Sequence, residues 1–390
     1  MEKKVSKNMA LAGAALGLGL LVGLLSAGFL HFVDWGQDLL WESGWSDFPF
    51  APLLICTVGG LLVGLCQRYF GNHPQTIAEA TRELAQTGRL AYQHLAHGLA
   101  TVGASLIFGA SLGPEAAIMD LLGGLSTWAA DRLNGLRSRL HLSQTKTNPS
   151  RFRRYAAKWP NILVVSTAMI VFGYGISSLY GRNLLIIRES FSWQDLIWSL
   201  PLGALGAAMG GGYVWLSGQS QKILRPLEKR LVLRAALAGI VFGFAASLLP
   251  MMLFSGQHDL QYAYDQATQL GAWLLFLIAL FRLVMTALLL GSGWKGGQFL
   301  PLMFASSALG LACSLAVPGI SAAAGILAVM AGLLAVVLPK PLVSLILMIL
   351  MFPVQYAGIV ILAVAAAAMI KAKVSGVPLI VPKTAVAAPE

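Results

Sequence analysis

The sequence predicts an all-α integral membrane protein that crosses the bilayer many times. Of its 390 residues, 57% are hydrophobic and 11% are charged, whereas soluble domains carry about 25% charged residues. Several apolar runs reach the roughly 20 residues that a helix needs to cross the hydrocarbon core. No segment between these runs is long enough to fold alone. We therefore expect residues 1–390 to form a single polytopic membrane domain without a soluble regulatory domain.

The first part of the chain contains three apolar regions. We predict spans at residues 9–32 and 51–69, and a third apolar region from residue 97 to residue 130. Lysines precede the first span, and the connection after it holds acidic residues but no Lys or Arg. Basic residues gather instead between residues 132 and 158. Because basic residues favour the cytoplasmic side, we expect a cytoplasmic N-terminus and a location in the cell inner (plasma) membrane.

The remaining spans are predicted at residues 161–180, 195–217, 232–254, 271–291, 299–317, 320–338 and 341–370, the last of them as two helices. We expect two pseudo-repeat halves, residues 8–190 and 191–385. The net charge of +11 lies mostly in short connections. This placement is typical of membrane topology, so we expect the lipid bilayer and not nucleic acid as a partner. The cysteines and histidines show no metal-site spacing, and no nucleotide-phosphate motif is present, so we expect no metal and no cofactor.

Glycine and proline interrupt the apolar sequence twice, once in each half. The first break lies in "FGASLGPEAAIMDLL", residues 108–122, and the second in "LLLGSGWKGGQFLPLMFASSALG", residues 288–310. Pro114 and Pro301 suit the first turn of a helix, because the missing N–H of proline costs nothing there. A lone kink usually serves packing. Matching breaks in two halves are typical of a transporter binding site near the middle of the bilayer.

A helix that begins inside the membrane attracts negative charge. Its first amides lack partners within the helix, and its N-terminus carries about half a positive charge. In hydrocarbon these amides would cost several kcal/mol each, so they must be buried in protein or lie against something negative. A small inorganic anion meets this need. Chloride is the default ion, and a bound chloride is the one bound group that we expect.

These residues resemble motifs of the CLC chloride channel and transporter superfamily. The third motif of that family, G-x-F-x-P, is matched by residues 297–301, and its second, G-x-E-G-P, is matched in part by residues 112–114. The first motif, G-S-G-I-P, falls on "FGNHP", residues 70–74, and Arg282 also resembles a family feature. The wording "SLGPE" resembles a divergent bacterial branch of ion-transport or channel proteins.

The resemblance implies a CLC-like fold with two inverted halves and many tilted and discontinuous transmembrane helices. It also implies a homodimer with one anion pathway in each subunit. The amides of Gln298 and Phe299 would face a central ion, and those of Leu112 and Gly113 an outer ion. The anion-binding candidates are Ser111, Leu112, Gly113, Pro114, Gly297, Gln298, Phe299, Leu300 and Pro301. The candidates for a gate or vestibule are Glu115, Gly71, Asn72, His73, Pro74 and Ile380.

The sequence departs from the family pattern at ionisable and hydroxyl groups. The family's gating glutamate falls on Leu112, and its inner proton glutamate falls on Leu184 or Leu185. Its coordinating serine and tyrosine fall on residues without a hydroxyl, Gly71 and Ile380. Leucine cannot exchange a proton at any pH, so the sequence predicts uncoupled, passive anion conduction.

Glu115 is the carboxylate nearest to the missing gate, three positions after Leu112. A glutamate in the first turn satisfies its own helix start, as in a capping box. We predict this structural role, in which Glu115 occupies positive potential that an anion would otherwise use. An ionisable residue inside a span is also a candidate functional group, so gating by Glu115 stays open, as does pairing with Arg282. Arg282 itself is predicted to be a structural charge.

Three functions are considered, in order of preference. The first is a CLC-type channel that conducts an anion, by default chloride, passively. The second is a proton-coupled chloride or fluoride antiporter that uses Glu115 in place of the missing carboxylate. The third is a membrane-embedded enzyme. The sequence disfavours the enzyme, because it shows no paired carboxylates, histidine cluster or nucleophile constellation.

Overall fold

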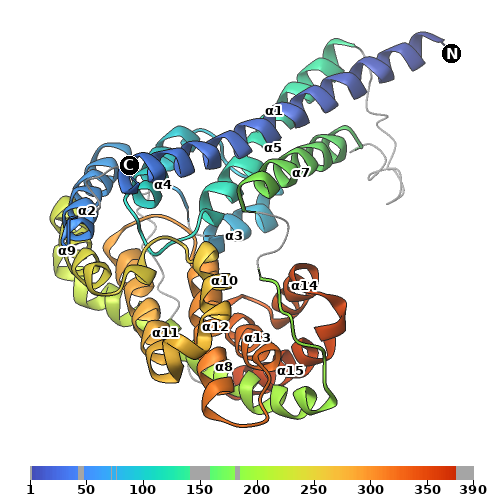
Figure 1. Ribbon diagram of the computed structural model, residues 1–390. Helices are drawn as coiled ribbons and strands as arrows, with labels where there is room; N and C mark the ends of the chain where they lie inside the picture. The colour runs from blue at the N-terminus through green and yellow to red at the C-terminus, as the bar shows by residue number, and fades with distance from the viewer. Residues whose placement is uncertain are drawn as a thin grey trace.

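The computed structural model describes residues 2–42, 48–71, 73–75, 77–140, 159–180 and 185–374, and helices make up its architecture (Figure 1). Asn72, Leu184 and Ile380 lie outside the described residues. Within the described part, the one β-type pairing is a single isolated bridge. The all-α prediction is therefore confirmed for these residues.

Two groups of helices are connected by the segment before Trp193. The first group consists of α1 (Glu2–Trp41), α2 (Ala51–Phe70), α3 (Ile77–Thr87), α4 (Leu95–Ile107), α5 (Glu115–Arg139) and α7 (Trp159–Tyr180). The second group consists of α8 (Trp193–Leu224), α9 (Leu231–Leu248), α10 (Gln257–Asp265), α11 (Ala267–Ser292), α12 (Phe299–Ala316), α13 (Ala322–Val337), α14 (Pro341–Met351) and α15 (Ala357–Val374). Three short 3-10 turns lie among them: Arg225–Leu227, Pro250–Met252 and Val354–Tyr356.

Six of the described helices are long and apolar enough to cross a bilayer, namely those at Ser6–Trp41, Ala51–Phe70, Leu231–Leu248, Ala267–Ser292, Phe299–Ala316 and Val354–Ala372. Shorter apolar helices lie between them, including α4 and α13. The chain is thus a multi-pass membrane protein, as predicted. The predicted division of residues 341–370 into two helices is also confirmed, because Pro353 separates α14 from the turn before α15.

Two helices extend past their predicted ends into segments that contain polar residues. The first helix runs on to Trp41 instead of ending at residue 32, because residues 33–41 contain no proline. Gly36, the one glycine among them, does not end the helix. The predicted span at residues 195–217 continues to Leu224, where the Arg225–Leu227 turn with its proline ends the α-helix. Apolar composition marks the part of a helix in lipid, whereas caps and proline mark its ends.

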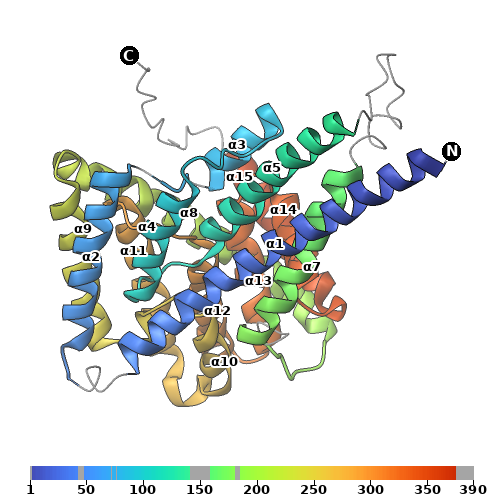
Figure 2. The ribbon, with the colours of Figure 1, turned by 90° about the horizontal axis from the view of Figure 1, so that it is seen from above.

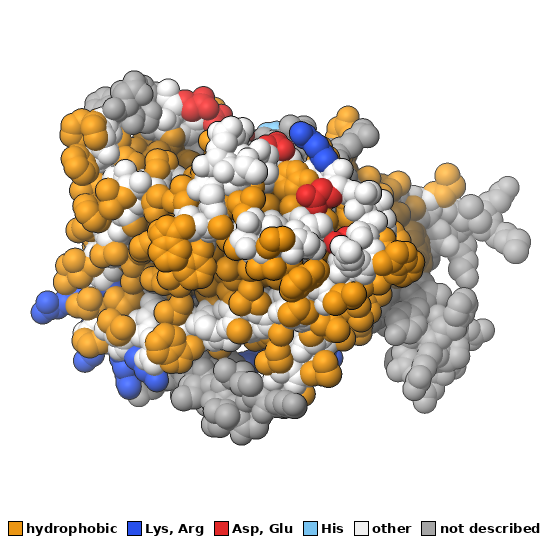
Figure 3. Space-filling model, turned by 60° about the horizontal axis from the view of Figure 1, so that its bottom comes forward, with side chains coloured by type: hydrophobic (Ala, Val, Ile, Leu, Met, Phe, Trp, Pro, Cys, Tyr) orange, Lys and Arg blue, Asp and Glu red, His pale blue; other side chains and the backbone are white. Residues whose placement is uncertain are grey.

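The best-buried elements are α12 and α13, which form the centre of the second group. Every residue from Ala323 to Ala335 is buried, and α8, α11 and α15 pack around this pair (Figure 1). In the first group, α1 packs along α5 and α7 (Figure 2). Apolar side chains also cover much of the outside, as Figure 3 shows for one face. A lipid-facing surface accounts for this, since lipid tails are as apolar as leucine.

Candidate functional site

The two breaks meet inside the protein. Gly113, before α5, and Gly297, before α12, form an antiparallel bridge in which each amide donates to the other's carbonyl, at 2.7 and 2.6 Å. Leu112 is fully buried beside this bridge, and a Cβ on Gly296 would lie 2.7 Å from the Leu112 Cβ. The two interrupted segments, one from each half of the chain, are therefore in direct contact. We call the bridge and the residues flanking it the loop crossing.

The amides of the first break are already engaged. Leu112 N–H donates to the carbonyl of Ala110 at 2.7 Å, and Gly113 N–H donates to Gly297. In this structure both amides, which the sequence analysis assigns to an outer ion, thus donate to backbone carbonyls. A loop that crosses another loop in a buried place satisfies its own amides first, because each unpaired one is costly.

The amides of the second break are arranged differently. Gln298 is the N-cap residue of α12 and makes no side-chain cap. Within the described part of the chain, the amides of Gln298 and Phe299 have no hydrogen-bond acceptor. Leu300 N–H donates to Glu115 Oε1 at 2.7 Å. The start of α12 therefore holds a carboxylate at the position where its dipole favours negative charge.

Glu115 connects the two helix starts. It is the first residue of α5, its carboxylate lies against its own amide, and it also reaches the first turn of α12. The prediction that Glu115 caps its own helix is thus incomplete, because an amide of the other half donates the hydrogen bond that fixes the carboxylate. Its second oxygen, Oε2, is buried and has no hydrogen-bond partner.

Arg282 does not pair with Glu115. Its guanidinium donates to the backbone carbonyls of Met251 and Phe254, the latter at 2.7 Å, and lies 4.4 Å from the ring centre of Phe304. The ion pairs among the described residues include Arg89 with Asp131 and Arg188 with Asp265. The open alternative of a Glu115–Arg282 pair is therefore wrong in this structure. The arrangement of Arg282 is the one expected of a charged side chain that fixes the segment before α10.

Two hydroxyl groups lie close to the loop crossing. Ser111 is fully buried, and its Oγ has no hydrogen-bond partner. The hydroxyl of Tyr213, on α8, donates to Gln298 Oε1 at 2.7 Å. Tyr213 was missed at the sequence level, where the signal available was a lone tyrosine behind three glycines in an otherwise apolar span.

Of the predicted vestibule residues, Pro74 contacts the second break. Gly71 ends α2 in the left-handed region, with φ of 81°, and His73 and Pro74 follow. Lys295, two residues before Gly297, donates from Nζ to the carbonyl of Pro74 at 3.2 Å. The structure thus brings the first and third motif regions together through Lys295, which the sequence analysis did not single out. Asn72 and Ile380 lie outside the described residues.

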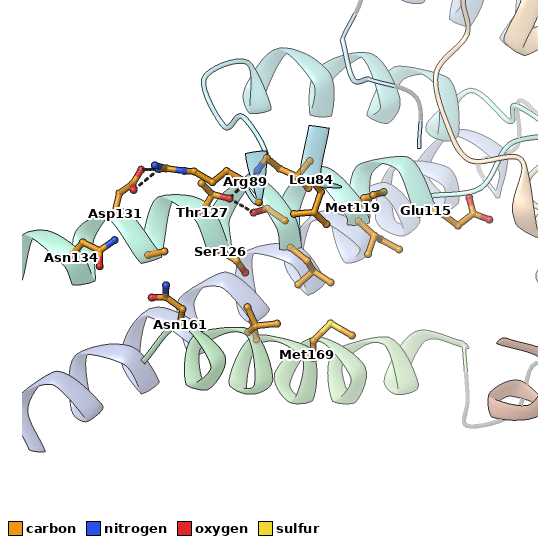
Figure 4. Close-up of a pocket in the computed structure, with 18 residues that line it drawn as sticks. Leu84, Arg89, Glu115, Met119, Ser126, Thr127, Asp131, Asn134, Asn161 and Met169 are labelled. Carbon is orange, nitrogen blue, oxygen red and sulfur yellow. Dashed lines mark hydrogen bonds and ion pairs between the residues drawn. The ribbon is translucent and has the colours of Figure 1, made fainter. Parts of the chain in front are cut away.

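A cavity of about 690 Å³ lies between α5, α7 and the segment before α4 (Figure 4). Glu115 stands at one end, and the Arg89–Asp131 pair stands nearer the other, with Asn134 and Asn161. Apolar side chains such as Met119 and Met169 line the middle. Among the described residues, no group of three His, Cys, Asp or Glu side chains has the arrangement of a metal site.

Comparison with known proteins gives concordant matches. A family model described as voltage gated chloride channel matches residues 148–372, more than half of the chain. A protein of Salmonella paratyphi A named "Putative ion-transport protein YfeO" is 24% identical over 373 residues, which cover 83% of this chain and 85% of the relative. The protein of the same name from Escherichia fergusonii is 22% identical over 355 residues, which cover 83% of each.

Two solved structures have the same fold. One is a CLC-type fluoride/proton antiporter, with a TM-score of 0.70 and 16% identity, covering 93% of this chain and 95% of the other. The second is a slow cyanobacterial Cl-/H+ antiporter, with a TM-score of 0.72 and 20% identity, covering 95% and 96%. At these identities the likeness establishes the architecture, which is the CLC-like one that the sequence motifs predicted.

Proposed function

Because this chain belongs to the voltage-gated chloride channel family, we propose that it moves a small inorganic anion, chloride by default, across the membrane through the loop crossing. The observation that carries the proposal is the hydrogen bond from the Leu300 amide to the Glu115 carboxylate, at 2.7 Å. A negative group already lies against the first turn of α12, and a mobile anion would be stabilised at that place for the same reason.

The proposed anion takes the place of the carboxylate. Three amides at the start of α12, those of Gln298, Phe299 and Leu300, then face it, and two of them have no other acceptor among the described residues. The side chain of Gln298 adds a further donor. Since its Oε1 accepts from the Tyr213 hydroxyl, its NH₂ group is left to donate elsewhere. Uncharged donors hold an anion without binding it so tightly that it cannot leave.

Glu115 is the gate in this proposal. A carboxylate and a chloride ion cannot share one helix start, because two negative charges in a buried place repel each other strongly. The anion enters only when the carboxylate swings away. Conduction stays passive if the displaced carboxylate remains charged, which agrees with the leucine at position 112.

A second candidate function is proton-coupled antiport of chloride or fluoride. The observation that favours it is the unpartnered Oε2 of Glu115. A buried carboxylate oxygen without a donor is a place where a proton is readily accepted. If Glu115 takes up a proton each time the anion displaces it, then proton and anion movements become linked.

Liposome flux with simultaneous pH recording tests both candidates. The variants are Glu115→Ala and Glu115→Gln, and the matched control is Glu189→Gln. The Glu189 carboxylate accepts a hydrogen bond from the Ala323 amide at the start of α13, at 3.0 Å. Like Glu115, it caps a helix of another segment, but this helix start belongs to neither of the two breaks. We expect Glu115→Ala to raise apparent chloride affinity by about tenfold, the size of one charge-assisted hydrogen bond, and the control to leave it unchanged.

The outcomes separate the candidates. Passive chloride flux without stoichiometric proton movement in the unaltered protein supports the channel. Stoichiometric proton movement that disappears in both Glu115 variants supports the antiporter. Unchanged conductance, selectivity and pH response in Glu115→Ala would overturn the role of Glu115 as the gate.

Family and fold indicate a transporter or channel instead of an enzyme. The proposal also includes the features that the resemblance implies for the whole assembly. These are two inverted halves, residues 8–190 and 191–385, and a homodimer with one pathway in each subunit. They also include the inner membrane as location, with the N-terminus in the cytoplasm.

A further inference from the structure

Three histidines stack on one another beside the loop crossing, although they are dispersed in the sequence. The ring centroids of His73 and His94 lie 4.3 Å apart with an angle of 16° between the planes. Those of His94 and His97 lie 5.8 Å apart at 28°, and Phe70 stacks on the far side of His97 at 4.9 Å. We call His73, His94 and His97 the histidine cluster. It joins the end of α2 to the start of α4.

The cluster is connected to the second break through Lys295. Lys295 Nζ donates to the carbonyl of Pro74, the residue after His73, and its backbone N–H donates to Ser105 Oγ on α4. Gly297 of the loop crossing follows two residues later. Lys295 therefore links the segment that carries His73 to the second break.

The surroundings of His73 disfavour its protonated form. Burial, and then the neighbouring His94, Lys295 and His97, lower the pKa of His73 below its ordinary value of 6.5. At neutral pH His73 is consequently uncharged, and it gains a proton only in acid. His94 is exposed, so protons and ions from the solution reach the cluster.

Charged groups of both signs surround Lys295. The groups that interact electrostatically with it are Glu79 on α3, Asp120 on α5 and Arg234 on α9. Protonation of the histidine cluster therefore adds positive charge next to Lys295.

An unused polar atom lies in the same place. His97 Nδ1 is buried and has no hydrogen-bond partner in the described part of the chain. The ring nitrogens lie at the edges of the stacked rings, and the described residues hold no group of three side chains with the arrangement of a metal site. When protonated, each ring instead offers N–H donors at its edge. Together with the Lys295 ammonium, these donors suit a small anion.

We propose that the histidine cluster and Lys295 form a second anion-binding site, which takes a small inorganic anion when the histidines are protonated. The site lies outside the loop crossing, and it depends on the proposed transport only for its effect on flux. Binding and protonation are reciprocal: the anion favours the protonated rings, and protonated rings favour the anion, by the same factor. Chloride binding must therefore take up protons from the solution.

The test measures binding without transport, in detergent-solubilised protein that carries Glu115→Gln. This substitution removes the carboxylate of the loop crossing as a source of protons. Chloride is titrated calorimetrically near pH 8 and near pH 5.5, the range in which histidine changes its charge, and proton uptake is followed in weak buffer. We expect affinity to rise on the order of tenfold at the lower pH, within the usual range for two linked ligands.

The substitutions His73→Gln and His97→Gln together, on the same background, are expected to abolish both the pH dependence and the proton uptake. His94→Gln, at an exposed position, serves if the double substitution impairs folding, and it should reduce both effects. His31→Gln is the matched control, since His31 is exposed on α1. Equal chloride affinity at both pH values, or proton uptake that survives in the histidine variants, would overturn the proposal. Because these readouts do not involve flux, they are independent of the outcome of the Glu115 transport experiment.

Discussion

Glu115 reaches the first turn of α12 because Gly297 has no side chain. A Cβ at Gly297 would overlap the carboxylate, and a Cβ at Gly113 would also meet it. Neither residue lies in the left-handed region, so the requirement for glycine here is space and not backbone conformation. Without side chains at these two positions, the two backbones approach closely enough to form the bridge, and space remains for the Glu115 carboxylate. The position of a single charged group thus depends on two missing side chains.

The hydroxyl of Tyr213 fixes the side chain of Gln298 at the same helix start. We predict that Tyr213→Phe, which keeps the ring and removes the hydroxyl, weakens chloride binding roughly fivefold, since one hydrogen bond contributes about 1 kcal/mol. Without this donor the Gln298 amide can turn, and its NH₂ group no longer faces the anion. Chloride titration in detergent and selectivity among chloride, fluoride and nitrate in liposomes measure the effect.

The matched control is Tyr356→Phe. Tyr356 is also buried, and its hydroxyl also donates a hydrogen bond, to the carbonyl of Glu189. Loss of this hydroxyl should lower thermal stability about as much as Tyr213→Phe does, and it should leave anion affinity and selectivity unchanged. Equal effects of both substitutions on affinity would mean that Tyr213 acts through stability alone.

Helix breaks could be predicted from the sequence, whereas the contacts made across them could not. Glycine and proline act locally, so Pro114 and Pro301 mark helix starts without knowledge of the fold. The partner of Glu115 lies 185 residues away, at Leu300, and a local rule can only assign a glutamate to its own helix. For the same reason the sequence could not show that the Gly113 amide donates to Gly297, which lies in the other half.

Packing between helices in the second group uses small residues at close contacts. A Cβ on Gly206 of α8 would overlap the carbonyl of Val329 on α13, and one on Gly332 would overlap the carbonyl of Gly203. Backbones that approach this closely gain van der Waals contact, which drives association of helices in lipid. Since α8 also carries Tyr213, this contact helps to set the distance from Tyr213 to the start of α12.

We predict that Gly206→Leu separates α8 from α13 and lowers stability by about 1–3 kcal/mol, the usual cost of overpacking. The melting temperature in detergent and the monodisperse fraction in gel filtration measure this effect. Gly211→Leu is the control on the same helix, because a Cβ there meets nothing within 4 Å. If both variants have the melting temperature of the parent protein, the close contact between α8 and α13 does not contribute to stability.

Charge at the two ends of the helices suggests how the whole molecule sits in the membrane. In Figure 3, most of the visible Asp and Glu side chains lie toward one edge of the apolar surface, and most of the Lys and Arg side chains toward the other. Basic residues end α5, with Arg137 and Arg139, and follow α8. Glu42 follows α1, and α10 holds Asp259 and Asp265. Because positive charge favours the cytoplasm, the basic edge should face inward.

Cysteine labelling tests this orientation. In a background in which Cys56, Cys66 and Cys313 are replaced by alanine, single cysteines are introduced at two exposed positions, by Glu42→Cys after α1 and by Gln221→Cys near the end of α8. A membrane-impermeant maleimide added to spheroplasts of a bacterial host should label the cysteine at position 42 at once, and the one at position 221 only after permeabilisation. The reverse pattern would turn the molecule over and place the N-terminus outside. The histidine cluster follows the end of α2, on the side opposite to the connection after α1, so the expected labelling would make it a sensor of cytoplasmic pH, and the reverse pattern would make it a sensor of external pH.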